Sequence, residues 1–540
     1  MTSAASADTA GRPNLIVILC DDMGFSDIGC FGSEIATPNL DAMARKGVTF
    51  TQMYNCARCC PTRASLLTGL YPHQAGVGHM VGDYGVPEYQ GYLRGDCVTI
   101  AEALKPAGYR TMYSGKWHCG GNYNIRTPER WAPGTKGYPY PISRGFDRFY
   151  GTLAGCGNYY YPHALMEQDR FIRPEGDDFY YTDAISEQAC RMIDEAAGGE
   201  EPFFLHVCYT APHWPLQVPE EDIARYAGRY RGGWDAVRTA RHERLNASGI
   251  LKSTWGISPR DPEAPRWEEL RPARRDWDDL RMAVYAAQVD RMDQGIGRIL
   301  SRLRERGVED NTIVMFLSDN GGCAEFLRED GDESSWPGLY RHTAPPGRTC
   351  TVGNIEAMRP GPATTFMSYD LPWANASNTP FRLYKHWVHE GGIATPLLVQ
   401  WPAGARPGVR SGAPCHVIDI MATCLDAAGA SYPEQRDGTA VQPLEGESFL
   451  PAVSGREWER VKPIFFEHEG NRAVRHGPWK LVSKWPGPWE LYDMDADRTE
   501  QHDLADKDAD RAKRLAAMYD GWAAARNVLP WDEVQRLQRG

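Results

Sequence analysis

The sequence predicts an α/β protein built on a large, doubly wound, mixed and mostly parallel sheet that is flanked by helices. Three observations predict this fold: mostly apolar runs of strand length, helical segments that alternate with them, and polar groups directly after the runs. The runs at residues 14–20, 202–208 and 311–317 suit strands that are buried on both faces. Open sheets of this kind bind ligands at the carboxyl ends of their strands, so the polar groups mark the candidate site.

Caps, apolar spacing and stop residues identify the helices between the runs. Thr99 and Glu102 form a capping box. Apolar residues recur at helical spacing from Met282 to Leu303, and Gly307 ends that long helix. The same signals predict, in chain order, helix 37–46, strand 48–50, helix 99–105, strand 109–113, helix 182–197, strand 396–399 and helix 416–428.

Two stretches lack a clear period. Residues 219–278 are polar and rich in arginine and tryptophan, which predicts an irregular excursion with short helices. Residues 330–378 are rich in glycine and proline, and a loop this long is usually a lid or a wall of a site.

The pattern changes near residue 456. Short strands that look antiparallel come before a final helix at 508–524. We therefore predict a large domain at 1–455 and a smaller α+β subdomain at 456–540 that carries an antiparallel sheet and a helix. The four short strands are expected at 463–466, 473–474, 479–482 and 489–492.

Composition narrows the class of protein. At 540 residues the chain is long enough for one large domain and one smaller one. The formal net charge of −12 argues against a nucleic-acid or acidic-membrane partner, because both favour a basic surface. Fourteen irregularly spaced cysteines do not resemble a disulfide scaffold. We see no secretory signal at the N-terminus and no apolar run of membrane-spanning length, so we expect a cytoplasmic protein with free thiols.

Acidic and amide side chains follow two of the apolar runs. Asp21 and Asp22 come after the first run, and Asp319 and Asn320 come after the run at 311–317. Adjacent carboxylates repel each other, and a hard divalent cation relieves that repulsion. The alternative for Asp21 and Asp22 is a pair of solvated loop acids.

Basic side chains follow two other predicted strands. Lys116 and His118 lie two residues apart beyond the strand at 109–113, where both side chains can reach one cleft. His213 lies in a turn between two prolines, and a rigidly held histidine suits a positioned acid or base. The alternatives are a surface lysine–histidine pair and a packed turn histidine.

The most distinctive stretch is 55–69, which holds three cysteines, a proline, an arginine and then apolar residues. Pro61 suits the first turn of a helix, so Cys59 and Cys60 lie at the helix N-terminus. Free N–H groups and the helix dipole favour negative charge there, so a sulfur would be activated or would carry an anion-binding group. Alternatively, Cys56 and Cys59 form a redox or zinc pair, or the thiols are simply buried.

Cys59, Pro61 and Arg63, followed by residues 67–69, resemble the signature of the formylglycine-dependent sulfatases, which is cysteine, any residue, proline, any residue, arginine. In that family the cysteine is oxidised to an aldehyde, formylglycine, whose hydrate attacks sulfur. Only Cys59 has proline two positions on and arginine four positions on. Similar stretches continue along nearly the whole chain, at 144–151, 389–392 and 489–493.

The resemblance is closest to the bacterial arylsulfatases of the alkaline-phosphatase-like superfamily. It implies that residues 1–455 form a catalytic domain that hydrolyses sulfate monoesters, such as aryl sulfates, to an alcohol or phenol and inorganic sulfate. The implied metal ligands are Asp21, Asp22, Asp319, Asn320 and the modified Cys59. The implied catalytic residues are Cys59, Arg63, Lys116, His118, His213 and Lys385, of which Lys116, His213 and Lys385 also bind the substrate.

The resemblance also implies cofactors and partners. Ca²⁺ suits an all-oxygen ligand set best, with Mn²⁺ or Mg²⁺ as alternatives. Formylglycine at position 59 requires a transient encounter with a formylglycine-generating enzyme. We further expect a small sulfate ester as substrate, a homodimer, and neither nucleic acid nor a membrane as a partner.

Two other functions stay open at this stage. One is a phosphonate monoester or phosphodiester hydrolase with the same nucleophile and metal, either as the main reaction or as a side activity. The other is a non-catalytic anion or metal binder in which Cys59 stays a thiol.

Overall fold

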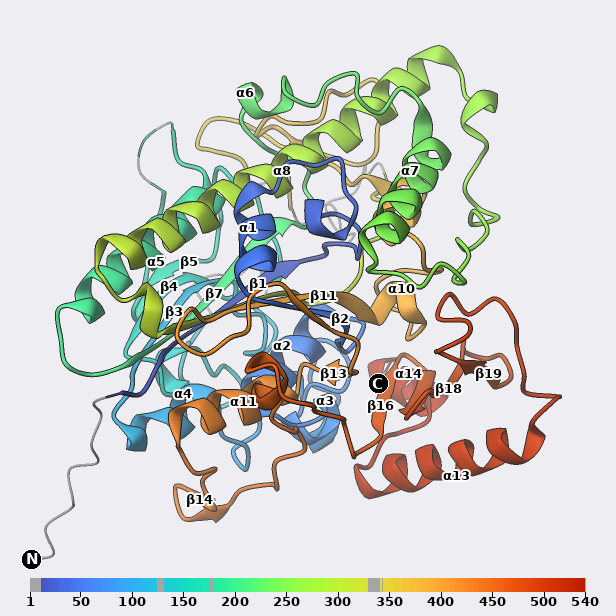
Figure 1. Cartoon of the computed structure of the whole chain (residues 1–540). Coiled ribbons are helices and arrows are strands. Elements are labelled where there is room, and N and C mark those ends of the chain that lie inside the picture. The colour runs from blue at the N-terminus through green and yellow to red at the C-terminus, as the bar shows by residue number, and fades with distance from the viewer. Residues whose placement is uncertain are drawn as a thin grey trace, which may run out of the picture.

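A single mixed sheet forms the centre of the molecule (Figure 1). The structure is a computed structural model that describes residues 11–123, 131–174, 176, 178–328, 340–341 and 343–539. Among these residues the sheet follows the strand order β12-β2-β11-β8-β1-β7-β3-β4-β5-β6, and β13 pairs with β2. The strands are β1 (Asn14–Asp21), β2 (Val48–Tyr54), β3 (Arg110–Gly115), β4 (Arg148–Thr152), β5 (Leu165–Glu167), β6 (Arg170–Phe171), β7 (Phe203–Pro212), β8 (Thr312–Ser318), β11 (Ala394–Gln400), β12 (Val409–Ser411) and β13 (Cys415–His416).

The centre of the sheet is parallel. Strands β8, β1, β7 and β3 run side by side in one direction, and β11 runs antiparallel between β8 and β2. In this register Leu15 of β1 lies beside Phe204 of β7 and Ile313 of β8. The carboxyl ends of four strands therefore meet at one edge, as the prediction of a doubly wound, mostly parallel sheet requires.

Helices cover both faces of the sheet, with α1, α5 and α8 on one side and α2, α3, α4 and α11 on the other (Figure 1). Alternate residues of β1 enter two separate cores: Ile16 packs on one side, and Leu15 and Val17 pack on the other. Double burial explains why these strands read as continuous apolar runs. The helices are α1 (Pro38–Lys46), α2 (Cys59–Thr68), α3 (Pro72–Ala75), α4 (Ile100–Leu104), α5 (Tyr181–Ala197), α8 (Pro272–Glu305) and α11 (Asp419–Ala428).

A second, four-stranded antiparallel sheet lies near the C-terminus, as predicted. Helix α13 (Ala509–Ala525) packs on its strands β17 and β18. A last helix, α14 (Trp531–Arg539), was not predicted, because its sequence is polar and buries only Val534. The start of a separate subdomain at residue 456 stays a prediction. The strands are β16 (Ile464–His468), β17 (Asn471–His476), β18 (Trp479–Ser483) and β19 (Glu490–Asp493).

The prediction that 219–278 holds only short helices is wrong. Besides α6 (Glu220–Ile223), this stretch contains α7 (Gly233–Ser248), which is 16 residues long. Part of the buried face of α7 consists of arginines: Arg238 donates to backbone carbonyls, and Arg241 pairs with carboxylates. Because charged groups occupy inward positions, the helix has no continuous apolar stripe for a sequence pattern to reveal.

Two smaller predictions also need comment. The helix predicted at 416–428 begins at Asp419, because residues 415–416 pair with β2 as strand β13. Part of the predicted insertion, 330–339 and 342, lies outside the described residues; the rest carries β9 (Thr351–Val352), β10 (Thr365–Phe366) and α9 (Asp370–Ser377). None of the described helices has the length and apolar composition needed to cross a bilayer.

Candidate active site

The four predicted oxygen ligands meet at the edge where β1 and β8 end. Asp21 is the last residue of β1 and Asp22 follows it, and Asp319 and Asn320 directly follow β8; all four are buried. The Asp22 backbone N–H donates to Asp319 Oδ1 over 3.2 Å, and Asn320 Nδ2 donates to Asp22 Oδ1 over 2.7 Å. Parallel pairing of β1 with β8 thus joins two segments that are nearly 300 residues apart in the sequence.

Each of the three carboxylates lies closest to a different predicted cation, and Arg63 also lies 3.7 Å from Asp21. The shortest N–O distances are 2.5 Å for Lys116–Asp21, 2.8 Å for Arg63–Asp319 and 2.9 Å for Lys385–Asp22. The six side chains are at most about a twentieth exposed, so water screens these charges little.

Lys116 reaches the site because β3 ends on a glycine. Gly115 has a φ of +122°, and a Cβ atom at this position would lie 1.9 Å from the carbonyl oxygen of Cys208 in β7. Only glycine permits so close an approach in this conformation. Two other site residues, Asp22 and His118, adopt φ of 64° and 52°, which is uncommon for residues with side chains.

Cys59 is the first residue of α2, as the sequence predicts. Its Sγ atom lies 3.3 Å from Nδ1 of His118. A hydrogen bond from Cys60 and the positive charge of Lys116 hold the pKa of the Cys59 thiol well below its usual range. Burial lowers the pKa of His118 to about 4, so this ring is neutral near pH 7 and offers a lone pair.

His213 follows β7 and faces both Asp22 and Lys385. Its Nδ1 lies 2.7 Å from the carbonyl oxygen of Trp214, which requires the proton to be on Nδ1. Its Nε2 lies 3.3 Å from Lys385 Nζ and 3.3 Å from Asp22 Oδ2. Burial lowers the pKa of His213 to about 4, so the ring is neutral near pH 7. With its one proton on Nδ1 it accepts at Nε2, so the lysine ammonium is the donor in this contact.

The donor set fits a divalent cation. Asp21 Oδ1 and Asn320 Oδ1 are buried oxygens with no hydrogen-bond partner in the part of the chain that the structure describes, which is unusual for buried polar atoms in a native fold. Burial, together with the charge of Asp21, raises the pKa of Asp319 well above its usual range. A hard cation would bond to the two free oxygens and keep the carboxylates ionised.

Comparison with known proteins identifies the family. The sulfatase family model matches residues 13–430. The chain belongs to the sulfatase family. A second model, described as N-sulphoglucosamine sulphohydrolase, C-terminal, matches residues 381–519. The arylsulfatase of Klebsiella aerogenes is 33% identical over 470 residues, which cover 84% of this chain and 94% of that protein. An uncharacterized sulfatase of Schizosaccharomyces pombe is 33% identical over 527 residues, which cover 92% of this chain and 90% of that protein.

Solved structures give the same fold. The crystal structure of Ps i-CgsB superposes with a TM-score of 0.66 at 25% identity, covering 95% of this chain and 93% of that one. The phosphonate monoester hydrolase of Agrobacterium radiobacter superposes with a TM-score of 0.56 at 18% identity, covering 95% and 96%, and this likeness concerns the fold alone. These findings confirm the predicted type I sulfatase family and alkaline-phosphatase-like fold, and they support hydrolysis of sulfate esters.

Glu325 and its partner Arg58 lie beside this sulfatase site, and the sequence did not predict a role for either residue. Glu325 accepts from Trp214 Nε1 over 3.0 Å and pairs with Arg58 over 2.9 Å. Burial opposes ionisation of Glu325, but Lys385 and Arg58 outweigh it and hold its pKa well below the usual range. Glu325 lies in a loop beyond β8 with no motif around it, so no local signal in the sequence marks it.

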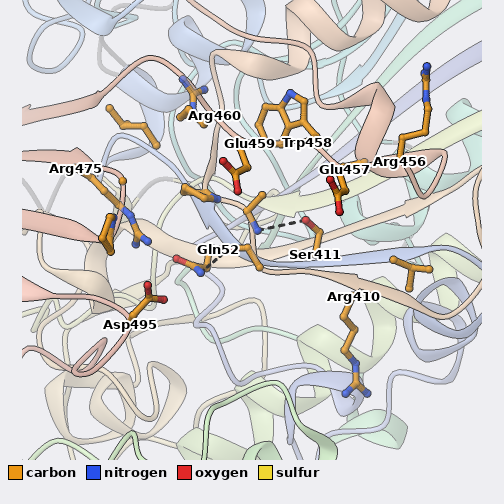
Figure 2. Close-up of a pocket in the computed structure, with 18 of the residues that line it drawn as sticks. Gln52, Arg410, Ser411, Arg456, Glu457, Trp458, Glu459, Arg460, Arg475 and Asp495 are labelled. Carbon is orange, nitrogen blue, oxygen red and sulfur yellow. Dashed lines mark hydrogen bonds between the residues drawn. The ribbon is translucent and has the colours of Figure 1, made fainter.

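A cavity of about 950 Å³ opens elsewhere on the sulfatase, beside strand β12 (Figure 2). Gln52, Arg410, Arg460 and Arg475 line it, and so do several residues between 455 and 462. None of the predicted catalytic or metal-binding residues is among its lining residues. The candidate site is therefore defined by its buried charged groups and not by this cavity.

Proposed function

We propose that the protein hydrolyses sulfate monoesters, aryl sulfates among them, with formylglycine at position 59 as the nucleophile. The observation that carries this proposal is the contact between Cys59 Sγ and His118 Nδ1, 3.3 Å apart, within a buried group of three carboxylates and three cations. A nucleophile beside both a base and concentrated positive charge is what attack on an anionic ester requires.

Different side chains stabilise negative charge and transfer protons in the proposed reaction. Arg63 and Lys116 offset the charge of the sulfate group, and His118 accepts a proton from residue 59. Lys385, which contacts His213, donates a proton toward the departing oxygen. The formylglycine hydrate supplies one hydroxyl that attacks sulfur and a second whose deprotonation expels sulfate. A serine lacks the second hydroxyl and would be left as a stable sulfate ester.

We further propose that Asp21, Asp22, Asp319 and Asn320, with residue 59, hold Ca²⁺, for which Mn²⁺ and Mg²⁺ are the alternatives. When bound, the ion polarises the sulfate oxygens and favours a deprotonated hydroxyl. All protein donors other than residue 59 are oxygens, which supports a hard cation. The formylglycine-generating enzyme as a transient partner, a homodimer and a cytoplasmic location remain predictions.

The test is turnover of an aryl sulfate and of an aryl phosphonate monoester by protein coexpressed with a formylglycine-generating enzyme. The mass of the tryptic peptide that contains Cys59 reports the modification independently of activity. We expect aldehyde at position 59 and a faster rate on the sulfate. If the aryl phosphonate is hydrolysed faster than the aryl sulfate, the protein is a phosphonate monoester hydrolase and the proposal is wrong. An intact thiol without turnover would favour the non-catalytic binder.

A further inference from the structure

A second group of candidate metal ligands lies apart from the acids that end β1 and β8. It consists of His79, in the segment after α3; His386, shortly before α10 (Glu390–Ile393); and His468 with Glu469, at the turn between β16 and β17. We call these four residues the histidine cluster. It joins segments that pack around the large sheet to the small antiparallel sheet.

The carboxylate of Glu469 is the centre of the histidine cluster. Its Oε1 lies 2.8 Å from Nε2 of His79 and 3.5 Å from Nε2 of His468, and its Oε2 lies 2.9 Å from Nδ1 of His386. Ligand atoms of His386, His468 and Glu469 lie within 4.8 Å of one another. Tetrahedral zinc, with ligands at about 2.0–2.2 Å, separates its donors by roughly 3.4 Å. The distances from Glu469 to His79 and His386, 2.8 and 2.9 Å, are shorter than this value, and the distance to His468, 3.5 Å, is slightly longer.

His468 provides an independent indication of a ligand. The residue is fully buried, and neither ring nitrogen makes a hydrogen bond to any residue that the structure describes. A buried imidazole without a hydrogen bond is unfavourable, and a metal bond at Nε2, which now faces Glu469 Oε1 at 3.5 Å, would relieve this. The ring of His468 also lies parallel to that of His79, with the ring centres 5.7 Å apart.

The surroundings suit ligation and entry of an ion. Nδ1 of His79 lies 3.0 Å from the hydroxyl of Tyr84. Metal-binding histidines are usually oriented by such a contact at the other ring nitrogen, and here it leaves Nε2 directed at the cluster. The side chains of His386 and Glu469 are 28% and 21% exposed, so the cluster opens to solvent on that side. Ligation by His386 Nδ1 places its proton on Nε2, so the Asn471 amide, which now donates to Nε2 and is also held by the carbonyl of His468 and the N–H of Trp485, must give up its contact with His386.

We propose that the histidine cluster binds one late first-row divalent ion of the zinc type and thereby ties the small sheet to the large one. The proposal separates two metal sites by their chemistry. Imidazole ligands suit Zn²⁺, Co²⁺ or Ni²⁺, whereas the carboxylates and amide at the ends of β1 and β8 suit a hard cation such as Ca²⁺.

The test is titration of the metal-free protein with Co²⁺ in the presence of excess Ca²⁺, which occupies the hard site. Co²⁺ bound by imidazole and carboxylate groups in four-coordinate geometry has a strong visible absorption. We expect one equivalent to develop this absorption in the wild-type protein, and Zn²⁺ to abolish it by displacement. His386→Gln and His468→Gln should lose it. His502→Gln, which removes an exposed histidine paired with Asp497, should keep it.

Thermal unfolding gives a second readout. Zn²⁺ should raise the Tm of the wild-type protein and leave that of His386→Gln unchanged, because only a folded state with the intact cluster binds the ion. His386 is partly exposed, so this variant tests the proposal even where His468→Gln fails to fold. The proposal is overturned if the wild-type protein takes up no stoichiometric Co²⁺ under these conditions, or if His386→Gln retains the full absorption and the full Zn²⁺-dependent rise in Tm.

Discussion

Lys385 Nζ lies 3.3 Å from His213 Nε2, and both groups contact the carboxylate of Asp22. Since the buried ring of His213 is neutral near pH 7 and its one proton faces the carbonyl of Trp214, Nε2 accepts from the ammonium. We therefore propose that the pair acts as one unit in catalysis, in which the histidine orients the lysine and the lysine carries the proton.

This relationship predicts a dependence on the leaving group. Lys385→Met should lower kcat by about 10²–10⁴-fold, the usual contribution of a general acid. The loss should be larger for phenyl sulfate than for 4-nitrophenyl sulfate, because the more basic phenolate needs the proton more. Initial rates on both esters check this. Equal losses on the two esters would assign Lys385 to sulfate binding alone.

Alanine substitutions of Cys59 and of its neighbour Cys60 should have very different effects on turnover. Cys59→Ala should abolish turnover, because it removes the residue that we propose is converted to formylglycine. Cys60→Ala is the matched control, since Cys60 is also buried at the start of α2 but lies 3.3 Å from Met80 Sδ. It should retain aldehyde at position 59 and most of the activity. Peptide masses of both variants check the assignment, which is wrong if the aldehyde is found at position 60.

The structure brings predicted site residues together where polar residues directly follow a strand. Asp21 and Asp319 stand out because a buried parallel strand reads as an apolar run and its end is then easy to locate. Lys385 is different: it lies in a loop before β11, and only the family resemblance indicated it. Its contact with Asp22 spans more than 360 residues, so no local period could reveal it.

Long-range contacts also explain what the sequence did not predict. Glu325 becomes part of the site only through Arg58 and Trp214, which lie on other segments. Helix α7 was missed because Arg241 occupies an inward position where patterns expect an apolar residue, and its charge is balanced by Asp27 and Glu34. The partners of Glu325 and of Arg241 are distant in the sequence, and secondary-structure propensity carries no information about such contacts.

Metal removal should reduce both activity and stability. A chelator leaves Asp21 and Asp319 buried beside each other without a bound cation, and burial raises the pKa of both carboxyls. A raised carboxyl pKa means that the metal-free fold loses stability as pH rises above about 4, the ordinary value for aspartate. The rise in Tm on adding Ca²⁺ should therefore grow with pH. Scanning fluorimetry with and without Ca²⁺ checks this, and a rise in Tm that shrinks with pH would contradict it.

Lys480 should hold the small sheet to the large one. Its Nζ lies 2.9 Å from Glu390 and 2.8 Å from Glu500, and all three side chains are fully buried. Lys480→Met should cost about 3–5 kcal/mol, because it removes the cation that the buried carboxylates of Glu390 and Glu500 share. Lys513→Met, at an exposed position in α13, should change stability by less than about 0.5 kcal/mol. Urea unfolding of both variants gives the comparison.

The pH dependence of the stability difference between the wild-type protein and Lys480→Met shows whether Lys480 stabilises the fold through its charge or through packing of its stem. Burial opposes ionisation of Glu390, but Lys480 and Arg498 outweigh it and lower its pKa to about 2. A lowered carboxyl pKa contributes stability above the ordinary glutamate value of about 4.3, and this contribution is lost as pH falls toward 2. The gap in stability between the wild-type protein and Lys480→Met should therefore narrow over that range. A gap that stays constant with pH would mean that the lysine stem stabilises the fold by packing rather than by its charge.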